Sequence, residues 1–134
     1  MISGSPRRSG LPAAGELAED VTTVRAAYRA LEARDEQALS RYVDPRVVWV
    51  HPLVTRLPFD GTLRGLPHIL RAAFRRNEEG TTACLCADTF LEMGDGVLVA
   101  GRFLGVGGKT DEPFLHECHV RDGRIFCVRG YPAA

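Results

Sequence analysis

The sequence predicts one compact α+β domain in which N-terminal helices pack against one side of an antiparallel sheet. Two patterns predict this arrangement. Apolar residues recur at spacings of three and four from about residue 16 to residue 33, which indicates a helix. After Gly80 the period becomes two, in four runs separated by turn residues, which indicates successive antiparallel strands. The length of 134 residues fits a single hydrophobic core.

Three helices are expected. The first begins near Glu16 and ends at residues 33–35. Asp35 can cap a short second helix. Pro67 suits the first position of a third helix, which runs to about residue 77. The apolar faces of these helices consist of Leu17, Val21, Val24, Ala27, Tyr28 and Leu31, then Ala38, Leu39 and Tyr42, then Ile69, Leu70, Ala73 and Phe74.

Five strands are expected from alternation and from β-branched or aromatic residues. The first covers residues 46–51, after a turn at Asp44-Pro45, and a loop follows over residues 52–66. The other four cover residues 82–92, 96–104, 112–120 and 124–131. Their hairpin turns are expected at Asp95-Gly96, Gly107-Gly108 and Asp122-Gly123. Residues 1–14 show no periodicity, so we expect a disordered tail before a domain that spans residues 15–134.

The last hairpin indicates which side chains face inward. A three-residue loop over residues 121–123 places one apolar set on a single face: Phe114, His116, Cys118, Val120, Phe126, Val128 and Gly130. The opposite face, which includes Ile125, Cys127 and Tyr131, is mixed. A two-residue turn at Asp122-Gly123 would mix both faces, so the three-residue loop is favoured. His116 is then the one ionisable group on a buried apolar surface.

The composition excludes several classes of partner. The 17 basic and 17 acidic residues give a net charge of zero, so nothing favours nucleic acid or an anionic membrane. No apolar run approaches the roughly 18 residues of a membrane span, and residues 1–15 lack the apolar core of a signal peptide. We therefore expect a cytoplasmic protein.

Cysteines and histidines form no recognisable metal motif. Cys84 and Cys86 are separated by one residue, which is unlike a zinc or redox pair, and the four cysteines are predicted to be small buried hydrophobes. A thiol or metal role for them is the alternative. His116 and His119 would point to opposite faces of a strand, which argues against a shared metal ion. We expect no metal and no cofactor.

The order of elements resembles the nuclear transport factor 2-like superfamily, and within it the SnoaL-like polyketide cyclases and ketosteroid isomerases. The resemblance covers roughly residues 20–132. It is carried by residues 28–35 with Ala38, Leu39 and Tyr42, by residues 44–52, by the glycines at 61 and 65 with the helix to Phe74, and by residues 121–131. It implies a cone-shaped, cystatin-like roll, in which a bent sheet wraps the helices around a deep apolar pocket. It implies fold more specifically than function.

The resemblance also implies two positions for polar groups. Family enzymes often place an acid or base at the end of the first strand, where this chain has His51 before Pro52. A second polar group lies in the middle of the second-to-last strand, which matches His116. The SnoaL-like cyclases pair that histidine with an aspartate on the last strand, and the matching position here is Gly130. This departure puts the cyclase reaction itself in doubt.

We interpret His51 as a candidate general base and His116 as a candidate acid or oxyanion donor for proton transfer next to a carbonyl. Burial would lower the pKa of each imidazole. Each histidine can equally be a hydrogen-bonded structural residue. His68, in the first turn of the third helix, and His119, on the outer face, are interpreted as structural. The pocket wall is expected to include Trp49, Tyr28, Phe74, Arg102, Cys118, Phe126 and Val128.

Three functions are therefore considered. The first is a cofactor-independent isomerase, cyclase or dehydratase acting on a hydrophobic carbonyl or polyketide-like compound. The second is a binding module for a small hydrophobic molecule, and the third is a dimeric accessory domain with a filled core. The direction of Arg102 and Asp88 is left open by the pattern. The mixed outer face of the sheet suggests a homodimer formed through the sheet.

Overall fold

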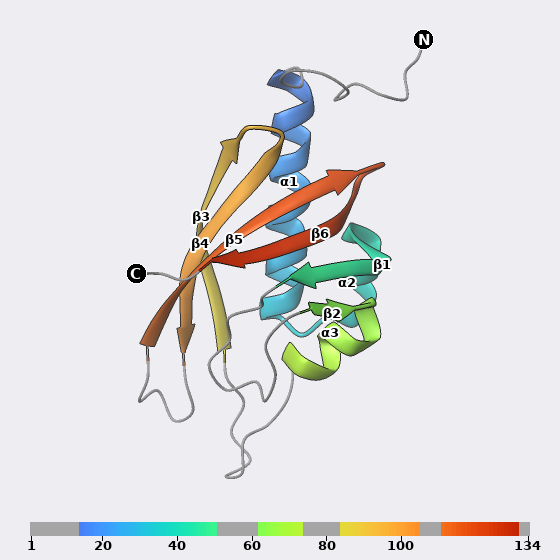
Figure 1. Cartoon of the computed structure of the whole chain (residues 1–134), viewed down its shortest axis with the longest axis vertical. Helices are drawn as coiled ribbons and strands as arrows, with labels where there is room; N and C mark the ends of the chain where they lie inside the picture. The colour runs from blue at the N-terminus through green and yellow to red at the C-terminus, as the bar shows by residue number, and fades with distance from the viewer. Residues whose placement is uncertain (1–13, 51–61, 74–83, 105–110, 132–134) are drawn as a thin grey trace.

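The computed structural model describes residues 14–50, 62–73, 84–104 and 111–131, which form an α+β fold as predicted (Figure 1). Three helices precede or interrupt the strands: α1 (Ala14–Glu32), α2 (Glu36–Tyr42) and α3 (Leu66–Ala73). Six strands complete the fold: β1 (Val43–Val50), β2 (Thr62–Arg64), β3 (Cys84–Met93), β4 (Gly96–Leu104), β5 (Asp111–Arg121) and β6 (Arg124–Tyr131). The tail predicted for residues 1–14 lies outside the described residues except for Ala14, at which α1 begins.

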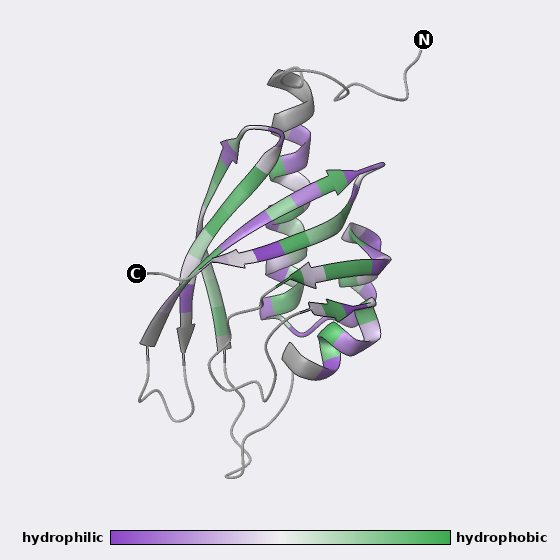
Figure 2. Cartoon of the chain, viewed as in Figure 1, coloured by the Kyte–Doolittle hydropathy of each residue, from purple (hydrophilic) through white to green (hydrophobic). Residues whose placement is uncertain are grey.

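All six strands belong to one sheet in the order β2-β1-β6-β5-β4-β3. β1 pairs with β6 in parallel, and every other neighbouring pair is antiparallel. The sheet bends around α1, which contacts β3, β4, β5 and β6 on its concave side (Figure 1). Apolar residues are concentrated on β4, β6 and β1 (Figure 2), and the side chains that these strands turn toward α1 form the core.

Local sequence explains the helices. Most of the apolar stripe predicted for α1 faces the core, since Val24, Ala27 and Tyr28 are all 5% exposed or less and Val21 and Leu31 are partly buried. The side chain of Leu17 lies outside the described part of the chain. Asp35 caps α2, because its carboxylate accepts the backbone N–H of Ala38 at 3.0 Å. The cap turns Leu39 into the core, as its position in the sequence predicted.

The region around β1 differs from the sequence prediction in two ways. The turn predicted at Asp44-Pro45 is wrong as a chain reversal, because both residues lie within β1. The carboxylate of Asp44 accepts a hydrogen bond from the backbone N–H of Arg46 at 2.8 Å. These residues lie between Val43 and Val48, where the pairing register between β1 and β6 shifts. The short strand β2 lies in the predicted loop and exists because it pairs with β1.

The last hairpin closes differently from the prediction. Asp122 and Gly123 both have positive φ, at 55° and 77°, and form a two-residue turn between Arg121 and Arg124. The register then shifts between His119 and Val120, because β6 carries one extra residue there. This bulge restores His116, Cys118, Val120, Val128 and Gly130 to the faces that were predicted for them.

The same bulge exchanges the roles of two residues. Ile125, predicted on the outer face, pairs with Val120 and is 2% exposed. Phe126 was predicted to face inward, but its ring instead packs against Arg121 and lies near the ring of His119. The guanidinium carbon of Arg121 is 4.2 Å from the centroid of the Phe126 ring. The predicted faces of Ile125 and Phe126 are therefore wrong.

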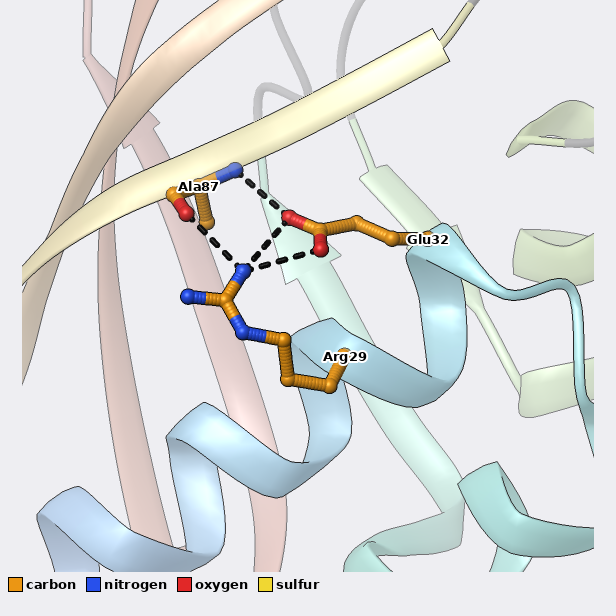
Figure 3. A network of polar contacts seen from close by, with 3 residues as sticks. All are labelled: Arg29, Glu32 and Ala87. Carbon is orange, nitrogen blue, oxygen red and sulfur yellow. Dashed lines mark hydrogen bonds and ion pairs between the residues drawn. The ribbon is translucent and has the colours of Figure 1, made fainter.

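A polar clamp holds α1 to β3 (Figure 3). Glu32 accepts the backbone N–H of Ala87 at 2.7 Å, and Arg29 donates to the backbone oxygen of Ala87 at 3.0 Å. Arg29 also donates to Glu32 at 2.8 Å. Because β3 is an edge strand, one side of it has no strand partner, and α1 satisfies both backbone groups of Ala87 instead. The clamp sits one turn beyond Tyr28 and fixes the position of that turn against the sheet.

The clamp gives a testable prediction for stability. Replacing Glu32 by Ala leaves the N–H of Ala87 without an acceptor, and we expect a loss of about 1–2 kcal/mol in the free energy of unfolding, measured by urea denaturation. Glu32→Gln is the matched control, because its amide oxygen still accepts that N–H. Since the side chain of Arg29 is 52% exposed, the ion pair itself contributes little, and Glu32→Gln should lose clearly less. Equal losses in both variants would contradict the importance of the strand bond.

Candidate active site

A small apolar cavity lies between the helices and the concave face of the sheet. Its volume is about 50 Å³, enough for roughly four water molecules. Residues from α1, α2, β1, α3 and β6 line it, among them Tyr28, Leu39, Trp49, Ile69, Ile125 and Val128. Two of these side chains, Tyr28 and Trp49, carry a polar atom, but the atoms that face the cavity are almost all apolar.

His116 lies beside this cavity in the middle of β5, with 2% of its surface exposed. Its Nδ1 atom is 2.7 Å from the hydroxyl oxygen of Tyr28. Phe114 and Trp49 enclose the ring, with centroids 4.5 Å and 5.3 Å away. Burial in these surroundings lowers the pKa of His116 to about 3, because the imidazolium loses its hydration without a compensating charge. The imidazole is therefore neutral at physiological pH.

The cross-strand neighbour of His116 explains why no carboxylate compensates it. The residue directly opposite on β6 is Gly130, at the position where the SnoaL-like cyclases are expected to carry an aspartate. A carboxylate there would raise the pKa of the imidazole. With glycine in that place, the hydrogen-bond partner of His116 comes from the helix side and is uncharged.

Tyr28 connects the cavity to His116. Its hydroxyl oxygen also lies 3.5 Å from the sulfur of Cys118, and burial raises the pKa of the phenol well above its usual value. A neutral phenol and a neutral imidazole can share one proton in two ways. Either the phenol donates to Nδ1, or Nδ1–H donates to the phenol oxygen and leaves the phenol O–H to point elsewhere.

Cys118 is a buried neighbour in this cluster. Its side chain is fully buried, and this burial raises the pKa of the thiol to about 12. The thiolate is the nucleophilic form of cysteine, and it is absent at neutral pH with such a pKa. Cys118 therefore contributes packing and a weak hydrogen bond to Tyr28.

The structure brings together five of the nine residues that the sequence singled out for the site. Tyr28, Trp49 and Val128 line the cavity, and His116 and Cys118 lie directly against Tyr28. Arg102 is exposed on β4, and Phe126 packs on the outer face. His51 and Phe74 lie outside the described residues, so their roles stay predictions.

The sequence did not predict the hydrogen bonds of the site. Tyr28 was interpreted only as pocket wall, although its place in the apolar stripe of α1 was the available signal for an inward hydroxyl. Ile125 lines the cavity and was assigned to the opposite face. Asp88 is exposed and bonds Thr89, and Cys86 is exposed, so the prediction of four buried cysteines is wrong for Cys86.

The outer face of the sheet carries a separate polar cluster. The carboxylate of Glu117 accepts a hydrogen bond from the hydroxyl of Tyr131 at 2.6 Å and contacts His119 at 2.9 Å. Both contacts lower the pKa of the Glu117 carboxyl, and the hydrogen bond from Tyr131 has the larger effect. His68 is exposed and bonds the backbone oxygen of Arg64. Neither histidine reaches the cavity lining. The homodimer predicted through this face stays a prediction.

Among the side chains that the structure describes, no group of three or more His, Cys, Asp or Glu residues is arranged to hold a metal ion. Within the same part of the chain, no helix combines the length and the apolarity needed to cross a bilayer.

Comparisons with known proteins agree with this architecture. A family model described as the SnoaL-like domain matches residues 24–128. Bal32a, from a soil-derived mobile gene cassette, superposes with a TM-score of 0.72 at 20% identity, over 87% of this chain and 90% of that one. A putative ketosteroid isomerase from Kribbella flavida gives 0.69 at 17% identity, over 87% and 80% of the two chains.

A putative polyketide cyclase from Sinorhizobium meliloti gives a TM-score of 0.62 at 20% identity, over 82% of this chain and 94% of that one. Several other similar structures belong to proteins described as being of unknown function. At these identities, the structures support the fold and leave the reaction open. No curated protein sequence matches the chain.

The low pKa of His116 predicts how stability depends on pH. The folded protein holds His116 neutral down to about pH 3, whereas the unfolded chain takes up a proton near pH 6.5. The stability that depends on neutral His116 is therefore complete above pH 6.5 and is lost as the pH falls toward 3. Between about pH 6.5 and pH 5, wild-type protein should lose roughly 1–2 kcal/mol more than His116→Gln, measured by urea denaturation.

The exposed His68 supplies the matched control for this experiment. His68→Gln removes an exposed histidine and leaves His116 in place, so the loss of stability that His116 causes at low pH should persist in this variant. If His116→Gln and wild type lose stability in parallel, His116 is not held neutral by burial.

Proposed function

Because the chain belongs to the SnoaL-like family, we propose that its cavity binds a hydrophobic carbonyl or polyketide-like compound and carries out acid/base chemistry on it without a cofactor. The reaction class is isomerisation, cyclisation or dehydration. The observation that carries this proposal is the position of Tyr28, which lines the cavity and hydrogen-bonds the buried, neutral His116.

The Tyr28–His116 pair suits the stabilisation of an oxyanion. Removing a proton next to a carbonyl develops negative charge on the carbonyl oxygen, and a preorganised donor lowers the energy of that state. With the proton on Nδ1, His116 donates to the phenol oxygen, and the phenol O–H is free to donate to a ligand oxygen. Both groups stay uncharged, so the pair supplies a donor in an apolar site without a buried ion.

The same environment makes His116 a poor base. A general base works best when its pKa lies near the operating pH, and a pKa of about 3 is far below that range. We propose that the base is His51, which comes two residues after Trp49 in the sequence and would share its face if the alternation of the strand continued. His51 lies outside the described residues, and its role rests on the sequence and on the family resemblance.

A second function, ligand binding without chemistry, is favoured by one observation. Apart from Tyr28 and Trp49, the residues that line the cavity are apolar, and an apolar pocket with few polar groups also serves a simple carrier. The two functions differ in whether any bound carbonyl compound is converted, and turnover measurements decide between them.

The test is turnover, by wild type and by single variants, of small β,γ-unsaturated ketones, which isomerisation converts into conjugated ketones, and of small β-hydroxy ketones, which dehydration converts into enones. Removing the base in His51→Ala should lower kcat by about 10²–10⁴-fold. Removing the donor in Tyr28→Phe should lower kcat by about 10²–10³-fold, with a smaller change in KM. His116→Ala should also lower kcat, because the hydroxyl of Tyr28 loses the hydrogen bond that orients it.

His68→Ala is the matched control and should turn over substrate at the wild-type rate, since His68 is exposed. Circular dichroism spectra of each variant check that it is folded. Unchanged turnover in both His51→Ala and His116→Ala would end the catalytic proposal. Binding of these compounds without conversion by wild type would favour the carrier function.

A further inference from the structure

The cavity between the helices and the sheet presents almost only carbon atoms to a group that enters it. The two lining side chains that carry a polar atom turn that atom away. The hydroxyl of Tyr28 contacts His116 at 2.7 Å and Cys118 at 3.5 Å. The indole nitrogen of Trp49 is buried and has essentially no accessible surface. A group inside the cavity therefore meets hydrocarbon on every wall that the structure describes.

Walls of this kind discriminate between ligand groups by their polarity. An apolar cavity stays dry, because a water molecule inside it would lose its hydrogen bonds. A ligand oxygen placed there gives up its hydration and gains no donor from the walls, which is unfavourable. A CH₂ group placed there leaves water and strengthens binding by roughly fourfold. The cavity therefore selects for the part of a ligand that carries no heteroatom.

The volume of the cavity limits the size of that part. An apolar cavity of about 150 Å³ in another protein takes up one benzene ring. The cavity here has about 50 Å³, so at the same density it holds roughly two or three carbon atoms. Leu39, Val47 and Ile69 in its walls are each 7% exposed or less, and such packed side chains do not readily move apart. An ethyl or propyl group therefore fits, and an aromatic ring does not.

We propose that the cavity binds the ligand by a short saturated alkyl end of about two or three carbon atoms. The ligand is then an uncharged ketone whose alkyl end enters the cavity, while its carbonyl group stays outside the apolar walls. The inference rests on the proposed function in one respect, namely that the cavity belongs to a site for a small molecule.

Two kinds of probe test the cavity through the methyl resonances of its lining residues Val47 and Ile69. Xenon tests the empty cavity itself and should shift these resonances, whereas benzene should leave them unmoved. Pentan-2-one and 1-methoxypropan-2-one share a carbonyl group and a length, and differ by the exchange of one CH₂ group for an oxygen. Pentan-2-one should bind about tenfold more tightly than the methoxy ketone. It should also bind about fourfold more tightly than butan-2-one, which is one CH₂ group shorter.

Three variants show that the probes occupy this cavity. Ala27 lines it, so Ala27→Leu should fill the space and abolish the shifts caused by xenon and by pentan-2-one. Ala26→Leu is the matched control, because it makes the same change at the next position of α1, outside the cavity lining, and should keep both shifts. Ile69→Val acts in the opposite direction and disturbs packing little. It enlarges the cavity by one carbon atom, so the affinity for hexan-2-one should rise relative to that for pentan-2-one.

The outcomes separate this inference from the proposed function. Equal or tighter binding of the methoxy ketone would overturn the alkyl end as the group that is bound, while leaving a small-molecule site in place. Benzene bound in the wild-type cavity would overturn the size limit, and an absence of xenon shifts would show that the space is not open to a ligand. Xenon shifts without binding of any of the ketones would remove the proposed small-molecule function itself, and this inference with it.

Discussion

The hydrogen bond between Tyr28 and His116 is the interaction on which the interior of this protein depends. It joins the C-terminal part of α1 to the middle of β5 across an apolar core. Each partner alone would be a buried polar group without compensation, and such groups are costly. Together they satisfy one another, so the core can hold an imidazole and a phenol without any ion. The lining of the cavity stays almost wholly apolar for this reason.

Other features of the chain keep this bond in place. The clamp of Arg29 and Glu32 on Ala87 fixes α1 one turn beyond Tyr28. Gly101 lets β3 and β4 approach closely at the same level, because a Cβ there would collide with the backbone oxygen of Cys86 and lie 2.8 Å from the ring of Phe114. Phe114 in turn packs against both Tyr28 and His116. The polar pair is thus supported from the helix, the edge strand and its own strand.

Much of this arrangement could be predicted from sequence, and the failures have physical causes. Apolar periodicity located the helices, the long strands and the inward direction of His116, because burial acts on every residue of those elements. The places of Ile125 and Phe126 depend on one extra residue in β6, which is a property of pairing and leaves no local trace. The strand β2 is three residues long and is defined by its partner β1, so its own sequence could not reveal it.

The site was predicted as a set of residues more successfully than as a network. Composition and alternation indicate that Tyr28, Trp49 and His116 face the core. They cannot indicate that a phenol from α1 meets the imidazole, because this contact spans 88 positions and depends on the curvature of the sheet. The exposed position of Arg102 depends equally on which side of β4 meets the helix, and both faces of that strand look apolar in the sequence.

The burial of the Tyr28–His116 pair also limits the roles that His116 can have in the proposed reaction. An imidazole that is desolvated enough to stay neutral to about pH 3 is a good neutral donor and a weak base. Donor and base therefore cannot be the same residue here, and a base must stand where its charged form can reach water. We propose His51 for this role, because it directly follows β1 in the sequence. On this proposal the departure from the cyclase pattern at Gly130 is coherent: without an aspartate beside it, His116 keeps a low pKa, and proton abstraction requires a different residue.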